Sequence, residues 1–409
     1  MRNLVILAIG LVLLGTSASV EAQGKGKARG IGLNDQARQE LVDAGVTKYR
    51  GEFTPVGTVP KADGWSQHLF DPAYQSNGLP AGPVCIAGTP YSAYSKGGDP
   101  KKLLIFLQGG GACWQGFTNC NILAEAQDPT QLLDADAMPP GIFSDDTDNP
   151  VDDWSVVYLP YCDGSVFVGD NDVADGAFPF GPVRYHRGLR NVTAGIDLAK
   201  SLFPDARRIM VAGSSAGGVG AASFAPFLTR FAFGDQVKLS VFNDAGPVAV
   251  NPDDTAAINA RADDWQFGQF YPASCTECDA RGQSTPLIMW RLDNDKSVRE
   301  SFYSTDGDTT NRFFMNLLGS PIPVYRDLLL TEHGKLEAAH PARYKRFIVF
   351  GQITHTALQA PRFFETSIDG VPLVDWTEDF LQPGARAYRE KNTKGKGPKK
   401  NSWVDLTGN

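Results

Sequence analysis

The residues best suited to chemistry surround Ser215, in the segment VAGSSAGG at residues 211–218. A serine in a Gly-x-Ser-x-Gly pattern can act as a nucleophile when it lies on a tight turn between a strand and a helix. An apolar run, 208–212, precedes this serine, and a helix-compatible stretch, 219–233, follows it. The pattern predicts a nucleophilic serine, and its alternative is a structural turn that uses the same small residues.

A glycine-rich loop supplies a second requirement of acyl transfer. The sequence LQGGGACW at residues 107–114 follows the apolar run 101–107. Acyl transfer needs backbone N–H groups aimed at the developing oxyanion, and a glycine loop after a strand can place them. We expect Gly110 and Gly111 to be these donors, together with the N–H group of Ala216. A phosphate-binding loop is excluded because no Lys-Ser/Thr pair follows the glycines.

A general base is expected late in the chain, because hydrolases with a Gly-x-Ser-x-Gly turn follow the order serine, acid, histidine. His355 lies shortly after the apolar run 347–350 and is the predicted base. His68 and His186 precede the serine and are interpreted as structural residues. His333 and His340 lie in a polar segment and are weaker candidates for the base.

The acid that would orient this histidine must lie between Ser215 and His355. Asp308 follows the apolar run 298–305 in a turn, and an acid there would hold the imidazole tautomer and stabilise the imidazolium. Aspartates are common in turns for structural reasons, so four rivals stay open. They are Asp306, Asp293, Asp295 and Asp244.

Strands that alternate with helices must position these residues. Continuous apolar runs predict strands buried on both faces at 101–107, 154–159, 208–212, 237–242, 298–305 and 347–350. Helical periodicity lies between several of them, at 191–202, 219–233 and 286–292. We therefore expect an α/β fold with a mostly parallel sheet, helices on both faces, and catalytic residues at the carboxyl ends of the strands.

Length and composition fit a single large domain with loop insertions. The chain has 409 residues, of which 42% are apolar, enough for a sizeable core. Residues 1–22 read as a signal peptide, with Arg2, an apolar stretch and a small-residue cleavage site near Ala22, so we expect a secreted or periplasmic protein. The remaining boundaries are an N-terminal arm at 23–65, a catalytic domain at 66–385 and a basic tail at 386–409.

The net charge and the absence of metal-binding motifs in the sequence exclude several classes of partner. The net charge of −8 argues against nucleic acid as a partner, and no run besides the leader approaches transmembrane length. The acidic stretch 127–153 does not match a calcium loop, and no His-Glu zinc motif occurs. We expect a monomer without a cofactor or metal. Six cysteines in an exported chain indicate disulfides, and Cys275 and Cys278 fit a small local one better than a zinc or redox site.

Four segments together resemble the pectin acetylesterase/Notum family of α/β-hydrolases. They are FLQGGGACW at 106–114, YCDG at 161–164, AGSSAGG at 212–218 and NDAG at 243–246. The resemblance implies an α/β-hydrolase-like sheet and a secreted serine carboxylesterase that needs no cofactor. It places Ser215 as nucleophile, His355 as base, and Asp308, with the aromatic residues that follow it, as acid.

The same resemblance implies the disulfide pairing. Cys113 with Cys120 looks like the family's small loop disulfide, Cys85 with Cys162 looks like its longer bridge, and Cys275 with Cys278 would be the remaining pair.

The resemblance specifies the reaction more closely than the substrate, because members of the family act on acetylated pectin or on a protein-bound fatty acyl group. An O-acetyl ester on a polysaccharide such as pectin is the first expectation, with a lipid or polyester as the alternative. A non-catalytic binding protein on the same scaffold is the third hypothesis.

Overall fold

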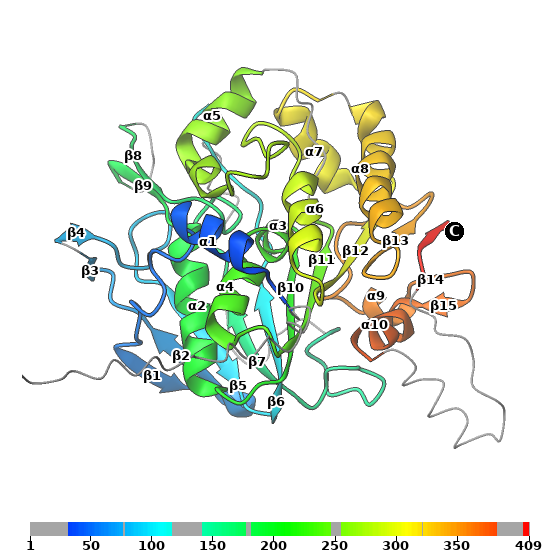
Figure 1. Ribbon diagram of the computed structural model, residues 1–409, viewed down its shortest axis with the longest axis horizontal. Coiled ribbons are helices and arrows are strands. Elements are labelled where there is room, and N and C mark those ends of the chain that lie inside the picture. The colour runs from blue at the N-terminus through cyan, green and yellow to red at the C-terminus, as the bar shows by residue number, and fades with distance from the viewer. Residues whose placement is uncertain are drawn as a thin grey trace, which may run out of the picture. The chain divides into compact units, whose positions relative to one another are not determined.

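The computed structural model describes residues 32–76, 78–116, 141–176, 181–246, 255–320, 322–382 and 404–408. These residues all belong to one compact unit, Ile31–Asn409. The unit is built around a ten-stranded sheet (Figure 1). In spatial order its strands are β1 (Gly57–Pro60), β2 (Trp65–Leu69), β5 (Ser92–Lys96), β7 (Trp154–Leu159), β6 (Asp99–Leu107), β10 (Arg208–Ser214), β11 (Lys238–Asp244), β12 (Arg299–Thr305), β13 (Tyr344–Val349) and β16 (Leu406–Gly408).

The sheet is mostly parallel. From β7 through β6 and β10 to β16, every pair of neighbours runs parallel. Only the edge formed by β1, β2 and β5 is antiparallel. Each apolar run predicted as a strand lies within or overlaps one of the parallel strands. The predicted α/β class and mostly parallel sheet are confirmed.

The central strands carry apolar residues on both faces, and each face packs into its own core cluster. In β6, Leu103 and Ile105 belong to one core cluster, whereas Leu104 and Phe106 belong to the other. This follows from the two-residue repeat of a strand, which sends successive side chains to opposite faces. A strand covered on both faces therefore reads as a continuous apolar run.

Helices cover both faces, as the sequence predicts. The larger cluster contains residues of α1 (Asp35–Asp43), α2 (Gly188–Leu202), α3 (Ala216–Ala222), α4 (Ala225–Phe233), α5 (Ala256–Trp265), α6 (Thr285–Asn294), α7 (Thr309–Leu317) and α8 (Tyr325–Ala339). The smaller cluster contains residues of α9 (Arg362–Glu365) and α10 (Leu373–Leu381). No helix within the described ranges is long and apolar enough to cross a membrane.

Short elements decorate the loops. Three two-stranded hairpins pair β3 (Gln75–Ser76) with β4 (Leu79–Pro80), β8 (Asn171–Ala174) with β9 (Val183–His186), and β14 (Ser367–Ile368) with β15 (Val371–Pro372). Short 3-10 turns lie at η1 (Ala62–Gly64), η6 (Phe267–Phe270) and η7 (Ile322–Val324).

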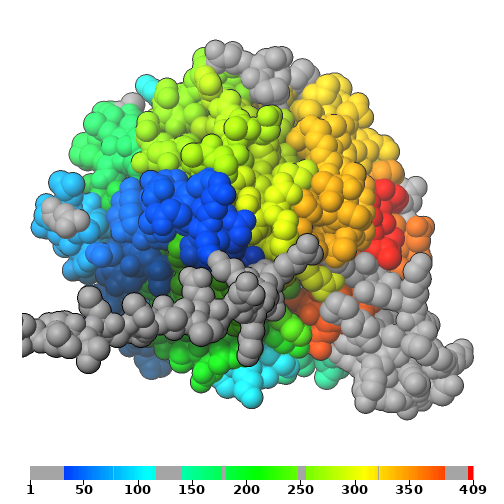
Figure 2. Space-filling view, viewed as in Figure 1, coloured from blue at the N-terminus to red at the C-terminus, as the bar shows by residue number. Residues whose placement is uncertain are grey.

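Parts of the predicted arm and tail are built into this unit. Leu33, Ala37 and Leu41 are buried in the larger core cluster, and Arg38 forms an ion pair with Asp235. Figure 2 shows this blue segment lying against green and yellow parts of the surface. At the other end, β16 pairs in parallel with β13, so residues 406–408 belong to the sheet rather than to a solvated tail.

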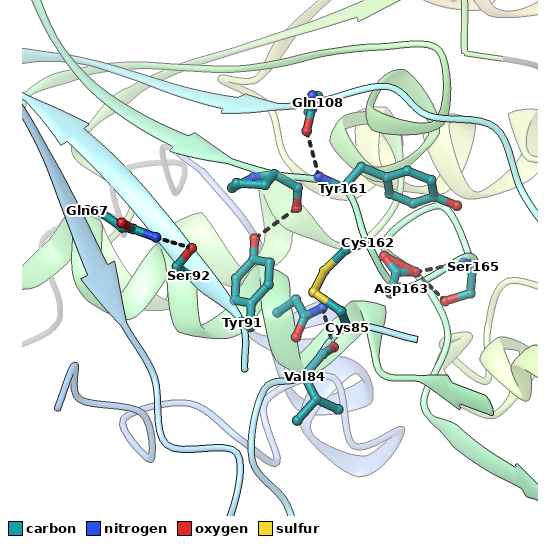
Figure 3. The surroundings of a disulfide bond; sticks show 12 residues. Gln67, Val84, Cys85, Tyr91, Ser92, Gln108, Tyr161, Cys162, Asp163 and Ser165 are labelled. Atoms are coloured by element: carbon teal, nitrogen blue, oxygen red, sulfur yellow. Dashed lines mark hydrogen bonds between the residues drawn. A yellow bond between two sulfur atoms is a disulfide. The ribbon is translucent and has the colours of Figure 1, made fainter. Parts of the chain in front are cut away.

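Disulfides link loops near the carboxyl end of β7. Cys85 is bonded to Cys162, three residues beyond β7, and Figure 3 shows Cys162 beside Tyr161 and Asp163. Cys275 is bonded to Cys278 within one loop. Cys113 is disulfide-bonded, and Cys120, its expected partner, lies outside the described residues.

Candidate active site

Ser215 lies on the tight turn that the sequence predicts. It directly follows β10 and precedes the first residue of α3, with φ 57° and ψ −119°. This conformation is strained for a residue with a side chain, and such strain persists only where the surrounding structure enforces it. The N–H group of Ser215 donates to the Asp244 carbonyl oxygen at 2.8 Å, and its own carbonyl accepts from Val219 at 3.1 Å. Hydrogen bonds on both sides therefore hold the turn.

The two glycines of the pentapeptide are required by close backbone contacts. A Cβ atom on Gly213 would lie 2.2 Å from the Gly217 carbonyl oxygen, and one on Gly217 would lie 2.0 Å from the Leu107 carbonyl oxygen. Both distances are far below van der Waals contact. The glycines therefore let the turn pack directly against the end of β6.

His355 and Asp308 lie in direct contact. The Nδ1 atom of His355 is 2.7 Å from Oδ2 of Asp308. Asp308 is fully buried, and the His355 side chain retains 20% of its exposure. The other ring nitrogen, Nε2, has no hydrogen-bond partner in the described part of the chain. His355 and Ser215 line the same open hollow.

Asn311 holds the carboxylate of Asp308 in place. Asp308 caps the N-terminus of α7 by accepting from the Asn311 N–H group at 2.9 Å. The Asn311 side-chain amide donates to Oδ2 of Asp308 at 3.1 Å and to the Ala245 carbonyl oxygen at 3.1 Å. Sequence reasoning did not assign Asn311 a role in the site. Its position three residues after Asp308 is the spacing of a helix cap, and that was the available signal.

The rival aspartates have other partners. Asp306 accepts from the Gly351 N–H group at 2.8 Å and pairs with Arg326 at 3.0 Å. Asp295 pairs with Arg230 at 2.6 Å. Asp293 contacts His340 at 3.1 Å. Among the described residues, no hydrogen bond or ion pair joins one of these three aspartates to His355.

Asp244 ties the serine turn to the histidine loop. Its carboxylate accepts from the Ser214 hydroxyl at 2.5 Å and from the N–H groups of Ala357 and Leu358, each at 2.9 Å. Burial raises the pKa of Asp244, and these hydrogen bonds oppose the increase. This side chain thus braces residues on both sides of the site, a role that its position after a strand did not reveal.

The other histidines contact residues other than Ser215. His186 is buried and its Nδ1 atom lies 3.0 Å from the Asp163 carbonyl oxygen. His333 stacks on Phe302, with ring centroids 3.6 Å apart. Burial lowers the pKa of both imidazoles. His68 lies 2.8 Å from the Ser95 hydroxyl, and burial lowers its pKa as well.

The glycine loop reaches the serine turn. A Cβ atom on Gly109 would lie 3.0 Å from that of Ser215, and one on Gly110 would meet the ring of Tyr161 at 2.4 Å. Gly111 has a φ of 85°, which favours glycine. Within the described ranges, the N–H groups of Gly110, Gly111 and Ala216 donate no hydrogen bond. Three backbone donors near Ser215 are thus available to a ligand.

Gln108 fixes the start of this loop. Its side-chain oxygen accepts from the Tyr161 N–H group at 3.0 Å, as Figure 3 shows. Cys162, the next residue, carries the disulfide to Cys85. The loop is thereby tied to a covalently anchored segment, a link that the sequence alone did not indicate.

Two hollows meet at Ser215. The open one is lined by the glycine loop and by His355, Thr310, Thr356 and Gln359. The more enclosed one is mostly apolar and begins at Gly111, Ser215 and Ala216. Its walls also include Trp114, Val166, Phe224, Trp265, Leu287 and Leu318.

Comparisons with known proteins relate part of the chain to a known family. Residues 72–270 match the family model described as pectinacetylesterase. This segment makes up 199 of the 409 residues and is similar to the pectinacetylesterase family. The match contains Ser215 and the glycine loop, whereas Asp308 and His355 lie beyond it. Pectinacetylesterases are carboxylic ester hydrolases, and the chain is an enzyme of that class.

A solved structure shares the fold. The Wnt deacylase Notum from Drosophila aligns with a TM-score of 0.57 at 17% sequence identity, covering 84% of this chain and 95% of that one. At this identity the likeness shows an α/β-hydrolase fold of the Notum type and no more. No curated protein sequence matches the chain significantly.

Proposed function

We propose that this protein is a serine carboxylesterase with Ser215 as nucleophile, His355 as general base and Asp308 as the acid that orients the base. The observation that carries the proposal is the 2.7 Å contact between His355 Nδ1 and Asp308 Oδ2. It leaves the unpartnered Nε2 atom in a hollow shared with Ser215. Three roles that acyl transfer requires are then filled by neighbouring groups.

The proposed reaction proceeds in two halves. His355 Nε2 takes the proton of the Ser215 hydroxyl as its oxygen attacks the ester carbonyl, and the N–H groups of Gly110, Gly111 and Ala216 stabilise the oxyanion. The ester C–O bond then breaks, and His355 returns the proton to the departing alcohol. Water, activated by His355, cleaves the acyl-serine and releases the acid. Ester and water thus give acid and alcohol, with the enzyme restored.

The two hollows divide the substrate between them. His355 must protonate the departing alcohol, so the alcohol belongs on the open side that His355 lines. The acyl group then occupies the enclosed apolar side, next to the oxyanion donors. An open alcohol side, lined in part by Thr310, Thr356 and Gln359, can take one unit of a long polysaccharide. The proposed first substrate is therefore an O-acetyl group on a polysaccharide such as pectin, which also accords with the family.

A second substrate class is favoured by the enclosed hollow. An acetyl group needs few apolar contacts, whereas the walls of this hollow include Val219, Phe224 and Leu287. Apolar walls of that extent suit a longer acyl group, as in a lipid or a polyester. A lipid or polyester is therefore the second proposed substrate class.

We also propose that the protein is exported. The apolar leader with a small-residue cleavage site supports export, and so do the disulfides, which persist in oxidising compartments. Mass spectrometry of the mature protein from the medium or periplasm would test this proposal. A chain retained in the cytosol with its leader intact would contradict it.

A chain-length series tests the proposed function. The rate of hydrolysis of p-nitrophenyl esters from acetate to palmitate is measured for the wild type and for Ser215→Ala. We expect Ser215→Ala to lower kcat by about 10⁴-fold or more, because the nucleophile is lost. Rates that peak at acetate, with acetate release from acetylated pectin, support the first substrate, and a peak at longer chains supports the second.

The outcome that contradicts the proposal is equally definite. A folded protein that hydrolyses no ester in a Ser215-dependent manner, and that does not react with a fluorophosphonate, would be a binding protein on a hydrolase scaffold. Labelling of the wild type but not of Ser215→Ala excludes that alternative, because the probe reacts only with an activated serine.

A further inference from the structure

The enclosed hollow beside Ser215 contains a cation that the proposed chemistry does not use. Arg261 of α5 lines this hollow and is only 9% exposed. The walls around it are mostly aromatic or aliphatic. An arginine in such a setting is unusual, because buried charges are normally paired.

Arg261 has few partners among the described residues. Its Nη2 atom donates to the Ala280 carbonyl oxygen at 2.8 Å, and its guanidinium lies 5.7 Å from the ring centroid of Trp265. The Nε atom has no hydrogen-bond partner there, and no carboxylate of a described residue lies within ion-pair distance of Arg261. Asp279, whose charge acts on Arg261, is itself paired with Arg281 at 3.4 Å. Burial lowers the pKa of Arg261 to about 10, so the group stays charged at neutral pH.

Two hydroxyl groups that line the same hollow also have unused hydrogen-bonding capacity. The Ser284 hydroxyl oxygen is buried and has no partner in the described part of the chain. The Tyr271 hydroxyl makes no hydrogen bond there either, and its charge interaction with Arg261 indicates that the two are near each other. A guanidinium accompanied by hydroxyl donors is a set that recognises a carboxylate.

This polar group lies beyond the oxyanion loop. The ring of Trp265 packs against that of Trp114, with centroids 6.3 Å apart, and its indole nitrogen donates to the Cys113 carbonyl oxygen at 2.8 Å. The guanidinium of Arg261 contacts the same Trp265 ring. Arg261 is therefore one aromatic side chain removed from the loop that carries Gly111. An acyl chain that starts at Ser215 has apolar walls along its path and a cation in the wall farther on.

We propose that the acyl group bound beside Ser215 ends in a carboxylate, and that Arg261 binds this carboxylate with Tyr271 and Ser284. The inference rests on the proposed function and specifies its substrate as a hemiester of a dicarboxylic acid. Ser215 cleaves the ester bond of that hemiester, water supplies the hydroxyl group, and the products are the free dicarboxylate and the alcohol.

The first experiment compares two esters of similar length. The values of kcat/KM are measured for the p-nitrophenyl hemiester of suberic acid and for p-nitrophenyl nonanoate, which lacks the terminal carboxylate. We expect the wild type to prefer the hemiester, and Arg261→Gln to lower the hemiester-to-nonanoate ratio about tenfold or more. Arg261→Lys keeps the charge and retains part of the preference. The matched control is Arg281→Gln, which removes an exposed arginine outside the hollow and leaves the ratio unchanged.

Removal of a buried arginine can impair folding, so two milder variants repeat the comparison. Tyr271→Phe and Ser284→Ala each delete one hydroxyl group and keep the guanidinium. Each is expected to lower the ratio by about threefold to tenfold, the effect of one hydrogen bond to a charged group. A wild type that prefers nonanoate, or a ratio that none of the three substitutions changes, overturns the inference and leaves Arg261 a structural residue.

A binding measurement separates this inference from the proposed function. Suberate and 1,8-octanediol, which has the same chain length but no carboxylate, are titrated by calorimetry into Ser215→Ala, which needs no turnover. Tighter binding of suberate that is lost in Ser215→Ala/Arg261→Gln supports the carboxylate site even if no ester is hydrolysed. Equal binding of both compounds, or no binding of suberate, overturns the inference even if the triad is shown to be active.

Discussion

The hydrogen bond between His355 and Asp308 is the contact on which the proposed reaction depends. An ionised carboxylate at Nδ1 fixes the tautomer in which Nε2 can accept a proton, and it stabilises the imidazolium that results. Asp308 is fully buried and already accepts two hydrogen bonds from Asn311. Its orientation toward His355 is therefore set before substrate binds.

Replacement of this carboxylate is the sharpest test of the assignment. We expect Asp308→Asn to lower kcat by about 10³- to 10⁴-fold, because the amide keeps the shape but not the charge that the imidazolium needs. Steady-state kinetics on a p-nitrophenyl ester that the wild type hydrolyses measures the effect.

Asp306→Asn is the matched control, because Asp306 lies two residues away and contacts Gly351 and Arg326 instead. We expect its kcat to stay within about threefold of the wild type, as for a substitution outside the reacting groups. The reverse pattern, with Asp306→Asn inactive and Asp308→Asn active, would assign the acid to Asp306.

Sequence reasoning placed these residues only in part. The Gly-x-Ser-x-Gly pattern is local, so Ser215 could be recognised without a structure. The choice of Asp308 over Asp306 depends on which side chain points toward a loop almost fifty residues later, at His355. The bracing roles of Asn311 and Asp244 depend on the same long-range contacts, and their types and spacing alone resemble those of ordinary turn residues.

The elbow between β10 and α3 illustrates how an element can limit its own sequence. The turn lies so close to β6 that the Gly217 position leaves no room for a methyl group. The strain at Ser215 is maintained by this contact and by the hydrogen bonds on either side of the turn.

Gly217→Ala should therefore destabilise the protein. Its Cβ atom would lie 2.0 Å from the Leu107 carbonyl oxygen, so β6 and α3 must separate. We expect the free energy of unfolding to fall by about 2 kcal/mol or more, as for overpacking in a core, and esterase activity to fall with it. Gly97→Ala is the control, because a Cβ atom there meets nothing within 4 Å. Denaturant unfolding curves that coincide for the two variants would refute this account.

Elements with a strong apolar signal were predicted well, and edge elements were not. The buried strands read as apolar runs because both faces are covered. The strands β1, β2 and β5 lie at the antiparallel edge and contain polar residues such as His68 and Ser95, so they carry no such run. The sequence predicts one helix over 219–233, but the structure has two. Helix α3 ends before Ser223, whose ψ of −105° is not helical, and α4 begins at Ala225.

The Cys85–Cys162 disulfide constrains a large part of the molecule. It joins positions 77 residues apart and holds the segment that supports the glycine loop. The Cys275–Cys278 disulfide, by contrast, closes a separation of only three residues. In the chain-entropy account, stabilisation grows with the length of the loop that a disulfide closes.

Removal of the two disulfides should have unequal effects. We expect Cys85→Ser/Cys162→Ser to lower the free energy of unfolding by about 4 kcal/mol, and Cys275→Ser/Cys278→Ser by about 1.5 kcal/mol. Reversible denaturation of the two variants and the wild type measures both values. Equal losses, or a larger loss from the short bridge, would contradict the dependence on loop length.

Acid should weaken the fold through His186. The buried imidazole accepts from Arg184 at 3.1 Å, and burial with the nearby arginine charge lowers its pKa to about 3 from 6.5. The unfolded chain therefore binds a proton between pH 6.5 and 3 that the folded chain does not. This contribution to stability is complete above pH 6.5 and is lost as the pH falls toward 3.

His186→Gln isolates this effect, because glutamine can accept and donate but does not titrate. We expect the wild type to lose about 5 kcal/mol more than His186→Gln between pH 6.5 and 3, because each pKa unit of difference corresponds to about 1.4 kcal/mol. Thermal or denaturant unfolding across that range checks it. Parallel stability profiles would show that His186 does not contribute to acid sensitivity.

The Asp244 carboxylate holds two segments of the site at once. Because one carboxylate holds both Ser214 and the residues after His355, we expect a small shift of β11 to move the proposed nucleophile and base together. The glycine loop is anchored elsewhere, through Gln108 and Tyr161. We therefore expect misalignment in a mutated or warmed enzyme to accumulate between the proposed catalytic pair and the proposed oxyanion donors. Such an enzyme would still form the encounter between serine and histidine, and it would fail first at holding the negative oxygen.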